Sequence, residues 1–208
     1  MKITEQAEYQ EMMLKYNFAM QRLETELNIL LKEYEYKKGY NPVEHIKTRM
    51  KSLESALKKL EEKGYEASVD NLVRKVYDMI GVRIVCSFLS DVYDIVELIR
   101  GSKQFIIKRE NNYIDYPKES GYRSYHLIVL VPIHLGERTE YIEAEIQIRT
   151  VAMDFWASLD HKLRYKIVDR VSDEIKMGTL ECSRDIYELD LKMQSLYDLL
   201  KNNDWKFS

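Results

Sequence analysis

Residues 141–150, YIEAEIQIRT, alternate cleanly between apolar and polar side chains. A period of two is typical of a β-strand with one face in a core and the other face outside it. The aliphatic face carries Ile142, Ala144, Ile146 and Ile148. The polar face carries Tyr141, Glu143, Glu145, Gln147 and Arg149. Two carboxylates, an amide and a guanidinium in one row fit either a solvated edge strand or the wall of a binding site.

A hairpin partner for this strand is predicted at residues 122–131, YRSYHLIVLV. On it Tyr122, Ser124 and His126 share one face, and the connecting residues 132–138 are short enough for a hairpin with a longer loop. Pairing would place an aromatic ring, a hydroxyl and an imidazole beside the polar face of the first strand. A ring offers a stacking platform and an imidazole exchanges protons near neutral pH, so this surface suits a nucleotide and a proton transfer.

Helices are predicted at both ends of the chain and after the second strand. Residues 4–38, 152–165 and 172–202 carry apolar side chains spaced by three and four, the period of an α-helix. Gly39 and Pro42 end the first helix. The three stripes are, in order, Tyr16, Met20, Leu23, Leu27, Leu30 and Tyr34; Met153, Trp156, Leu159 and Leu163; and Leu189, Met193, Leu196 and Leu200. We expect the terminal helices to lie across the core or against a partner subunit.

The segment that follows the first helix is compatible with two structures. As a helix, it carries an apolar stripe along residues 43–60. As a strand, residues 45–51 alternate, and Ser52 then caps a helix that ends at Gly64. The strand would place three cations on one face: Lys47, Arg49 and Lys51. Like charges repel, so this face implies a bound anion, although a solvated basic face is the alternative interpretation.

Short helices and strands are predicted to alternate along residues 68–108. In order, they are a helix at 70–77 capped by Ser68, a buried strand at 81–88, a helix at 91–100 capped by Ser90 and a strand at 104–108. Asp78 stands just before the buried strand, where a sheet presents its end to a ligand, although a lone Asp there is more often a cap or turn residue. Arg83 lies inside an apolar run and needs a partner for its charge. A polar loop follows at residues 109–120.

Composition narrows the class of protein. The 208 residues suit one domain with its own core, and 45% hydrophobic with 32% charged residues is an ordinary soluble balance. A net charge of −3 means that any basic function must be local. Cys86 and Cys182 lack metal-site spacing and the histidines are scattered, so we expect reduced thiols in a cytosolic protein. The sequence also leads us to expect no signal peptide and no membrane span.

Four motifs, TRMKSLES, DMIGVRI, PKESGYRSYH and EIQIRT, occur in this order. Together they resemble the synthetase domain of the RelA/SpoT family over about residues 45–166, and the pair GYRSYH and EIQIRT is the most specific part. The sequence has no paired His-Asp motif of the kind that a hydrolase domain carries, so we expect no such domain. It therefore looks like a small, stand-alone alarmone synthetase.

This resemblance implies an α/β (α+β) fold, with a nucleotidyltransferase-like mixed sheet of about five strands flanked by helices. We expect one synthetase domain over residues 1–208, with its core at 43–166, an N-terminal helix at 4–38 and a C-terminal helical segment at 172–202. The resemblance also implies a homotetramer. It leaves an alarmone or single-stranded RNA open as an allosteric ligand.

The resemblance further implies a reaction: transfer of the β,γ-pyrophosphate of ATP to the 3′-hydroxyl of GTP or GDP, with release of AMP. On the ATP side, adenine would lie between Arg49 and Arg83, and the phosphates would meet Lys51, Ser52 and either Lys58 or Lys59. On the acceptor side, Tyr122 would stack on guanine, and the supporting residues would be Lys118, Ser124, His126, Gln147 and Arg149. Glu145 would be the catalytic carboxylate. Asp78 would hold Mg²⁺, which Glu145 would share.

The chain departs from many relatives at Asn111 and Asn112, where a basic and an acidic residue are common, and Asp154 stands where some small synthetases have Asn. The first departure leaves the preference among GMP, GDP and GTP open. A non-catalytic, guanine-nucleotide-sensing or RNA-binding regulator on the same fold would also explain the cations and Tyr122. It would not explain two carboxylates beside a phosphate site, because carboxylates repel phosphate. We therefore favour the enzyme.

Overall fold

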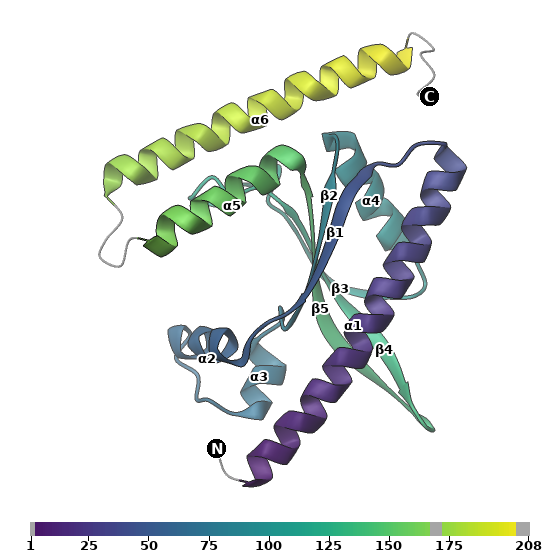
Figure 1. The fold of residues 1–208 in the computed structure, drawn as a ribbon, viewed down its shortest axis with the longest axis vertical. Helices are drawn as coiled ribbons and strands as arrows, with labels where there is room; N and C mark the ends of the chain where they lie inside the picture. The colour runs from purple at the N-terminus through teal and green to yellow at the C-terminus, as the bar shows by residue number, and fades with distance from the viewer. Residues whose placement is uncertain (1–2, 167–171, 203–208) are drawn as a thin grey trace.

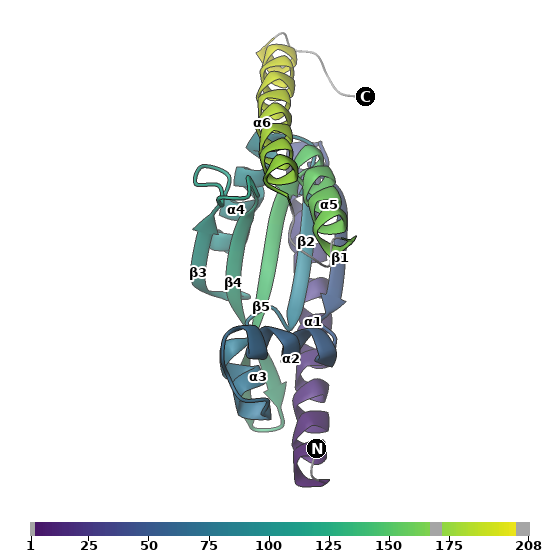
Figure 2. The same cartoon turned by 90° about the vertical axis from the view of Figure 1, so that its left-hand side faces the viewer.

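The structure, a computed structural model, describes residues 3–166 and 172–202, and five strands in these ranges form one mixed sheet. The strands are β1 (Val43–Met50), β2 (Ile80–Cys86), β3 (Ile106–Asn112), β4 (Tyr125–Leu135) and β5 (Arg138–Thr150). Their order is β1-β2-β5-β4-β3, so the last strand in sequence is the middle one in space (Figure 2). Strands β2 and β5 pair in parallel, and the other neighbouring strands pair antiparallel.

Six helices in the described ranges surround this sheet (Figure 1). The helices α1 (Ile3–Lys38) and α4 (Leu89–Gly101) pack against one face. Figure 1 shows α2 (Leu53–Glu62) and α3 (Val69–Lys75) at one end of the strands, and α5 (Val151–Lys166) and α6 (Asp173–Asn202) at the other end. The second face of the sheet is thus framed by α2 and α5. This arrangement confirms the predicted α/β (α+β) class, with about five strands and long helices near both ends.

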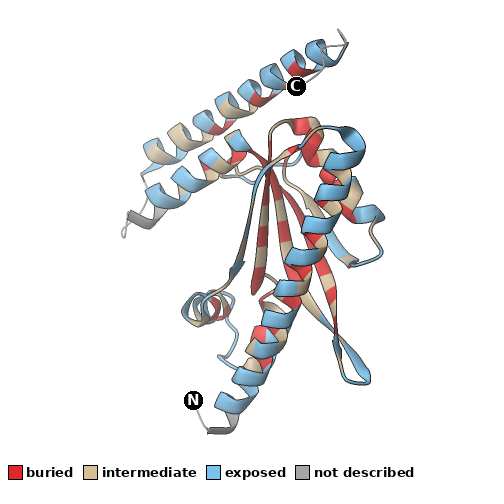
Figure 3. Ribbon diagram, turned by 45° about the vertical axis from the view of Figure 1, so that its right-hand side comes forward, coloured by how far each residue is buried: buried red, intermediate tan, exposed pale blue. Residues whose placement is uncertain are grey.

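The core lies between the sheet and the helices α1 and α4. Ile84, Leu127 and Ile146 of three neighbouring strands are fully buried there. Helix α1 adds a line of buried side chains on its inner side (Figure 3): Met12, Tyr16, Ala19, Leu23, Leu27 and Leu31. The stripe predicted for the first helix therefore packs on the chain's own core.

The strand alternative is correct for residues 43–50, and two of the three predicted caps are confirmed. Ser52 caps α2 and Ser68 caps α3, each accepting a hydrogen bond from a backbone N–H three residues on, at 3.2 Å. Such bonds satisfy N–H groups that have no partner inside the helix. Helix α3 ends at Lys75, two residues earlier than predicted.

The prediction that Ser90 caps a helix is wrong. Helix α4 begins at Leu89, and the carboxylate of Asp91 accepts the N–H of Phe88 at 3.1 Å. The backbone N–H of Ser90 donates instead to the side-chain oxygen of Gln194 in α6, at 2.9 Å. This N–H is therefore satisfied by a distant helix, which local sequence cannot reveal.

Several strand boundaries also differ from the prediction, and three of them affect the site. Strand β4 begins at Tyr125, so Tyr122 and Ser124 precede the strand instead of lying in it. Leu135 pairs with Arg138, which leaves a two-residue hairpin turn where a longer loop was expected. Strand β3 extends to Asn112, and β4 starts later than predicted, so the polar loop shifts from residues 109–120 to residues 113–124. In each case, pairing across the sheet overrides local composition, because a neighbouring strand supplies the hydrogen-bond partners.

Helix α6 contacts the rest of the chain through polar and aromatic side chains, and its predicted apolar stripe faces outward. Leu189 is 52% exposed and Leu196 is 55% exposed. The hydroxyl of Thr150, at the end of β5, donates to the carboxylate of Asp190 at 2.6 Å. On α5, Leu159 and Leu163 are exposed as well, although Met153 and Trp156 of the same predicted stripe are buried. The periodicity therefore identified both helices and part of the buried face of α5, but not the buried face of α6. Of the helices in the described ranges, none combines the length and the apolar character that a bilayer crossing needs.

The contact between Asp190 and Thr150 predicts a pH-dependent stability. Burial raises the pKa of Asp190 to about 6, although the hydrogen bond from Thr150 acts in the opposite direction. Because the folded-state pKa exceeds the unfolded value, the folded protein holds the proton more tightly, and stability falls as pH rises from about 4 to above 6. The full difference corresponds to about 3 kcal/mol.

We therefore expect the free energy of unfolding of Asp190→Asn to rise relative to wild type as pH increases from 4 to 7, as measured by urea denaturation. Asp198→Asn, which changes an exposed carboxyl of the same helix, should show no such pH-dependent gain. Parallel pH profiles for wild type and Asp190→Asn would contradict this account.

Candidate active site

The polar side chains of β1, β2, β4 and β5 converge on the sheet face that α1 and α4 do not cover. Strand register accounts for this convergence: Gly81 lies opposite both Arg49 and Glu145, and Gln147 lies opposite both Arg83 and His126. Residues in register on neighbouring strands point to the same side of a sheet. The site is therefore built largely from strand positions, on a rigid frame.

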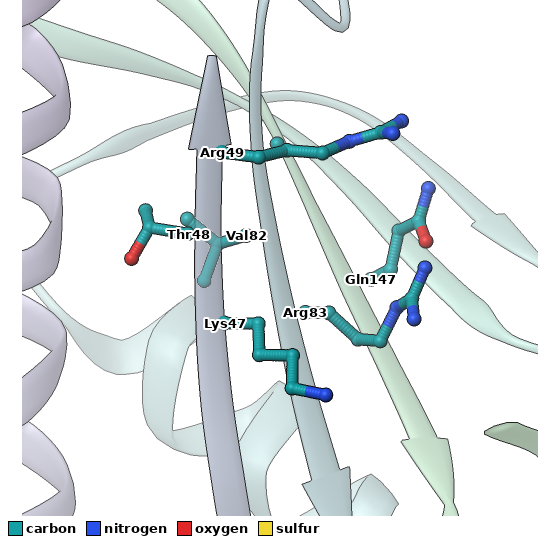
Figure 4. A pocket seen from close by; sticks show the side chains of 7 residues that line it. Lys47, Thr48, Arg49, Val82, Arg83 and Gln147 are labelled. Atoms are coloured by element: carbon teal, nitrogen blue, oxygen red, sulfur yellow. The ribbon is translucent and has the colours of Figure 1, made fainter. Parts of the chain in front are cut away.

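A cavity of about 310 Å³ lies on this face (Figure 4). It is lined by Lys47, Thr48, Arg49, Gly81, Val82, Arg83 and Gln147. Figure 4 shows Lys47, Arg49, Arg83 and Gln147 extending to the same side, while Thr48 points away. A more open cavity of about 720 Å³ shares Arg49, Arg83 and Gln147 and continues to Tyr122 and helix α5. The two cavities together run from β1 to the end of β5.

Arg49 and Arg83 flank the first cavity from two antiparallel strands. The side chain of Arg49 lies near Gly81, where an added Cβ would be 3.4 Å from the Arg49 Nε atom. The guanidinium of Arg83 contacts the carboxylate of Asp154 at 3.1 Å, which supplies the partner that its position in an apolar run requires. Two guanidinium planes beside one cavity can stack on an aromatic base.

Asp78 lies at the start of β2, between two lysines. Its carboxylate oxygens each accept a hydrogen bond at 2.8 Å, one from Lys51 and one from Lys59. Burial would raise the pKa of Asp78, but these hydrogen bonds and the two positive charges outweigh it and lower the pKa. The structure thus selects Lys59, rather than the exposed Lys58, as the α2 lysine next to the carboxylate.

Ser52 lies at the N-terminus of α2, beside this cluster. Its hydroxyl caps the helix and donates to the Ser55 hydroxyl at 2.8 Å. The free N–H groups and the dipole of a helix N-terminus favour an anion. Together with Lys51 and Lys59, this helix end forms a positively charged corner that suits phosphate oxygens.

Glu145 lies at the centre of β5, and both of its carboxylate oxygens are engaged. The Nδ1 atom of His126 lies 3.0 Å from one oxygen, and the amide of Gln147 donates to the other at 2.7 Å. Burial would raise the pKa of Glu145, but the contact with the His126 imidazole and the Gln147 hydrogen bond lower it overall. Glu145 is therefore a carboxylate at neutral pH.

A chain of hydrogen bonds leads from Glu145 to the end of β5. The Tyr122 hydroxyl lies 2.8 Å from the Nε2 atom of His126 and accepts from Arg149 at 2.6 Å. The side-chain oxygen of Gln147 also accepts from Arg149 at 2.6 Å. A neutral imidazole that donates from Nδ1 to Glu145 and accepts at Nε2 from Tyr122 satisfies every partner in this chain. The predicted side chains are thus joined in one network.

Arg149 was predicted to lie on an accessible polar face, but it is buried, with 3% of its surface exposed. The hydroxyl of Ser124 lies 3.3 Å from its Nε atom, and the carboxylate of Asp154 lies 3.1 Å from its Nη1 atom. A buried guanidinium needs such partners. From this buried position Arg149 fixes the side chains of Tyr122 and Gln147 by hydrogen bonds.

The loop 113–124 brings Lys118 to the same site. The Lys118 ammonium lies 5.0 Å from the centre of the Tyr122 ring and 4.6 Å from that of Tyr113, both within cation–π range. At the start of the loop, the Asn112 side chain accepts the N–H groups of Ile114 and Asp115, at 3.0 and 3.1 Å. Asn112 therefore has a local structural role at one of the positions where the chain departs from many relatives.

Three side chains of the site were given no role in the predicted reaction, although Lys47 was predicted to lie on the cationic face of its strand. Lys47 lines the cavity, Tyr113 meets the His126 ring edge-on at 5.1 Å between centroids, and Asp154 bridges Arg83 and Arg149. Lys47 could have been included, because it alternates with Arg49. Asp154 reaches the site from the first turn of α5, and Tyr113 reaches it from the loop 113–124. The spacing of apolar residues in the sequence predicts neither position.

A magnesium ion is the metal that the side chains here would suit. The described residues contain no group of three or more His, Cys, Asp or Glu side chains able to hold a metal. Asp78 stands three residues before Gly81, which is the register partner of Glu145 on the neighbouring strand. Mg²⁺ prefers oxygen ligands and is usually held by one or two carboxylates together with substrate phosphates. This carboxylate pair fits that pattern.

Comparison with known proteins identifies the family. Residues 48–169 match the family model described as a region found in RelA/SpoT proteins. The GTP pyrophosphokinase YwaC of Bacillus subtilis is 44% identical over 181 residues, which cover 87% of this chain and 86% of that protein. The chain belongs to the RelA/SpoT family.

Solved structures agree with this assignment. Small alarmone synthetase 2 from Bacillus subtilis superimposes with a TM-score of 0.82 at 42% identity, covering 91% of this chain and 98% of that one. Small alarmone synthetase 1 from the same organism, bound to its product pppGpp, gives a TM-score of 0.83 at 31% identity, covering 92% and 97%. The similarity thus extends beyond the sheet to almost the whole of each chain.

Proposed function

We propose that this protein is a GTP pyrophosphokinase, which transfers the β,γ-pyrophosphate of ATP to the 3′-hydroxyl of GTP or GDP and so makes pppGpp or ppGpp, the alarmones of the stringent response. The observation that carries the proposal is a pair of ionised carboxylates: Asp78, held between Lys51 and Lys59, and Glu145, which pairs in register with Gly81 of the first cavity. A site that only binds anions would bind phosphate more tightly without these carboxylates, because carboxylates repel phosphate. The relatives described above are named for the same activity.

The ATP side of the proposed site lies toward β1 and α2. Arg49 and Arg83 would hold the adenine between their guanidinium planes. The phosphates would be bound by Lys51, Lys59 and the N-terminus of α2 at Ser52. On binding, the two lysines would leave Asp78 and contact phosphate oxygens instead. Lys58 is exposed and would act only at the edge of this site.

The acceptor side lies toward β4 and the loop 113–124. Tyr122 would stack on guanine, with Lys118 beside the ring. His126 and Gln147 hold Glu145 in place, while Ser124 and Arg149 support the tyrosine from beneath. With guanine stacked on Tyr122, which is linked to Glu145 through His126, the acceptor ribose would lie next to Glu145 in the proposed complex.

In the proposed reaction, the acceptor's 3′-hydroxyl oxygen bonds to the β-phosphorus of ATP, the bond from that phosphorus to the AMP oxygen breaks, and the hydroxyl proton passes to Glu145. A positioned base of this kind is effective because a ribose hydroxyl is a poor nucleophile. Asp78 and Glu145 would hold Mg²⁺, which when bound neutralises charge on the phosphates. The lysines and arginines contribute the remaining positive charge.

The direct test is AMP release from ATP in the presence of Mg²⁺, with GMP, GDP and GTP offered as competing acceptors. We expect AMP and a 3′-pyrophosphorylated guanosine nucleotide in equal amounts. The competition also measures which acceptor is preferred by a chain that carries Asn111 and Asn112. Nucleotide binding with no AMP release would favour the alternative function, a non-catalytic sensor or RNA-binding regulator.

We also propose that the protein is a cytoplasmic homotetramer. The outward-facing apolar side chains of α6 and the resemblance to small synthetases support the assembly, and the resemblance alone supports an alarmone or single-stranded RNA as a regulatory ligand. The net charge of −3 does not favour a broadly basic RNA-binding surface, so an RNA site would have to be local. Light scattering at micromolar concentration measures the assembly, and a monomeric mass would contradict it.

Glu145→Gln keeps the shape of the side chain and removes the base. We expect both nucleotides to bind, and turnover to fall roughly 10²–10⁴-fold, the usual range for losing general-base help. Glu143→Gln is the matched control, because Glu143 lies two residues earlier on the same strand face and pairs with Lys108 outside the cavity. Wild-type turnover in Glu145→Gln would remove this residue from the mechanism.

Asp78→Asn removes one carboxylate and leaves Lys51 and Lys59 without their shared partner. We expect turnover to be lost at every Mg²⁺ concentration, while the circular dichroism spectrum keeps its α/β shape. Thermal unfolding in the absence of nucleotide should begin at a lower temperature, because the two lysines then repel each other. Activity that returns at saturating Mg²⁺ would show that Asp78 is not an essential ligand.

Tyr122→Ala removes the stacking platform of the acceptor. By analogy with base–aromatic stacking elsewhere, we expect weaker GDP binding by roughly 1–3 kcal/mol and unchanged ATP binding, measured by calorimetry. Tyr122→Phe should retain GDP affinity but lose turnover, because it lacks the hydroxyl that joins His126 to Arg149. Tyr116→Ala, at an exposed position of the same loop, is the control. Equal weakening of both nucleotides would mean that Tyr122 is only a packing residue.

A further inference from the structure

The loop 113–124, which carries Lys118 and Tyr122, is held in shape by a tight turn. The backbone N–H of Lys118 donates to the carbonyl of Tyr122 at 3.2 Å, and the N–H of Gly121 donates to the carbonyl of Lys118 at 2.8 Å. Gly121 has a φ of +86°, a left-handed conformation that glycine adopts readily. The turn places Lys118 beside Tyr122, so its position sets the geometry of the proposed acceptor site.

Helix α6 supports this turn from behind by direct contact with Gly121. A Cβ added at Gly121 would lie 2.7 Å from the Cβ of Ser183 and 3.2 Å from a methyl carbon of Leu180. The hydroxyl of Ser183, which is itself buried, donates a hydrogen bond to the carbonyl oxygen of Gly121. The glycine therefore permits a close approach that any larger residue would prevent.

A second contact from the same side of α6 lies one helical turn further on. The Tyr187 ring faces the guanidinium of Arg123, with 3.8 Å between the ring centre and the Cζ atom. Arg123 also donates to the carbonyl of Ile114, and so ties the end of the loop to its beginning. Ser183 and Tyr187 are four residues apart and therefore share one face of the helix.

From these contacts we infer that Ser183 and Tyr187 are positioning residues, which hold the loop 113–124 so that Tyr122 and Lys118 are preorganised for the acceptor guanine nucleotide. This inference rests on the proposed function, because it takes that loop to be the acceptor-binding loop. Neither residue lines the two cavities described above, so both act through the loop. Preorganisation matters because a mobile loop must lose conformational freedom when the nucleotide binds.

A simple packing role for α6 would have a different signature. The helix is also attached at sites away from the loop, where Trp156 donates to the carbonyl of Thr179 at 2.9 Å and Phe88 stacks on Tyr197 at 4.2 Å. Losing one hydroxyl at Ser183 leaves these attachments in place. A positioning role therefore predicts a selective loss of acceptor binding, whereas a packing role predicts a loss of stability without selectivity.

The test uses Ser183→Ala in the full chain, with steady-state kinetics and calorimetry. We expect the KM for GDP and its Kd to rise about three- to ten-fold, the range for one lost hydrogen bond, with kcat and the KM for ATP nearly unchanged. Ser195→Ala is the matched control, because Ser195 is an exposed serine of the same helix whose hydroxyl bonds only to the carbonyl of Leu191 among the described contacts. It should leave both KM values unchanged.

Variants at Tyr187 provide a second, independent measurement. Tyr187→Leu removes the ring above Arg123 and should also raise the Kd for GDP selectively, while Tyr187→Phe keeps the ring and should restore wild-type affinity. Unchanged GDP affinity in both Ser183→Ala and Tyr187→Leu, or an equal loss of ATP and GDP affinity, would overturn the inference. Wild-type AMP release in the same assay tests the proposed function separately, since the binding measurements do not depend on turnover.

Discussion

Charge compensation on a half-buried sheet face is the constraint on which the rest of this structure depends. Lysines and arginines gather where phosphates would bind, and they would repel one another if nothing opposed them. Asp78 lies between Lys51 and Lys59, and Asp154 lies between Arg83 and Arg149. Each acidic residue thus serves two cations, which keeps the face stable without a ligand and leaves each cation within reach of one.

The two faces of the sheet divide the work of folding and binding. Helices α1 and α4 bury the aliphatic side of β2, β4 and β5, so stability comes from one face and polar groups can occupy the other. The N-terminus of α2 borders one end of the charged face, and the first turn of α5 borders the other end. Helix α6 adds no side chain to either cavity, yet it contacts the loop that carries Tyr122.

Much of this arrangement could be predicted from the sequence, because strand alternation and helical spacing are local properties. The β5 pattern placed Glu145, Gln147 and Arg149 on one face, and Ser52 and Ser68 were recognised as caps. The failures lie where a distant element supplies the partner. The backbone N–H of Ser90 donates to Gln194 of α6, and the outward side of α6 is as apolar in sequence as a core-facing stripe. Arg149 is buried because Asp154 and Ser124 meet it, which only the folded chain shows.

The order of the strands has a consequence for how the protein forms. The strands β3, β4 and β5 follow one another as antiparallel neighbours, and β1 pairs with β2, so the sheet consists of two locally connected parts. Their one seam is the parallel pairing of β2 with β5, which joins residues more than sixty positions apart, such as Gly81 and Glu145. Long-range pairings of this kind carry a large loop-closure cost. Arg49 and Arg83 lie on one side of the seam, and Glu145 and Tyr122 lie on the other. A chain in which β2 and β5 have not yet paired therefore has two separate halves of the site and no complete active site.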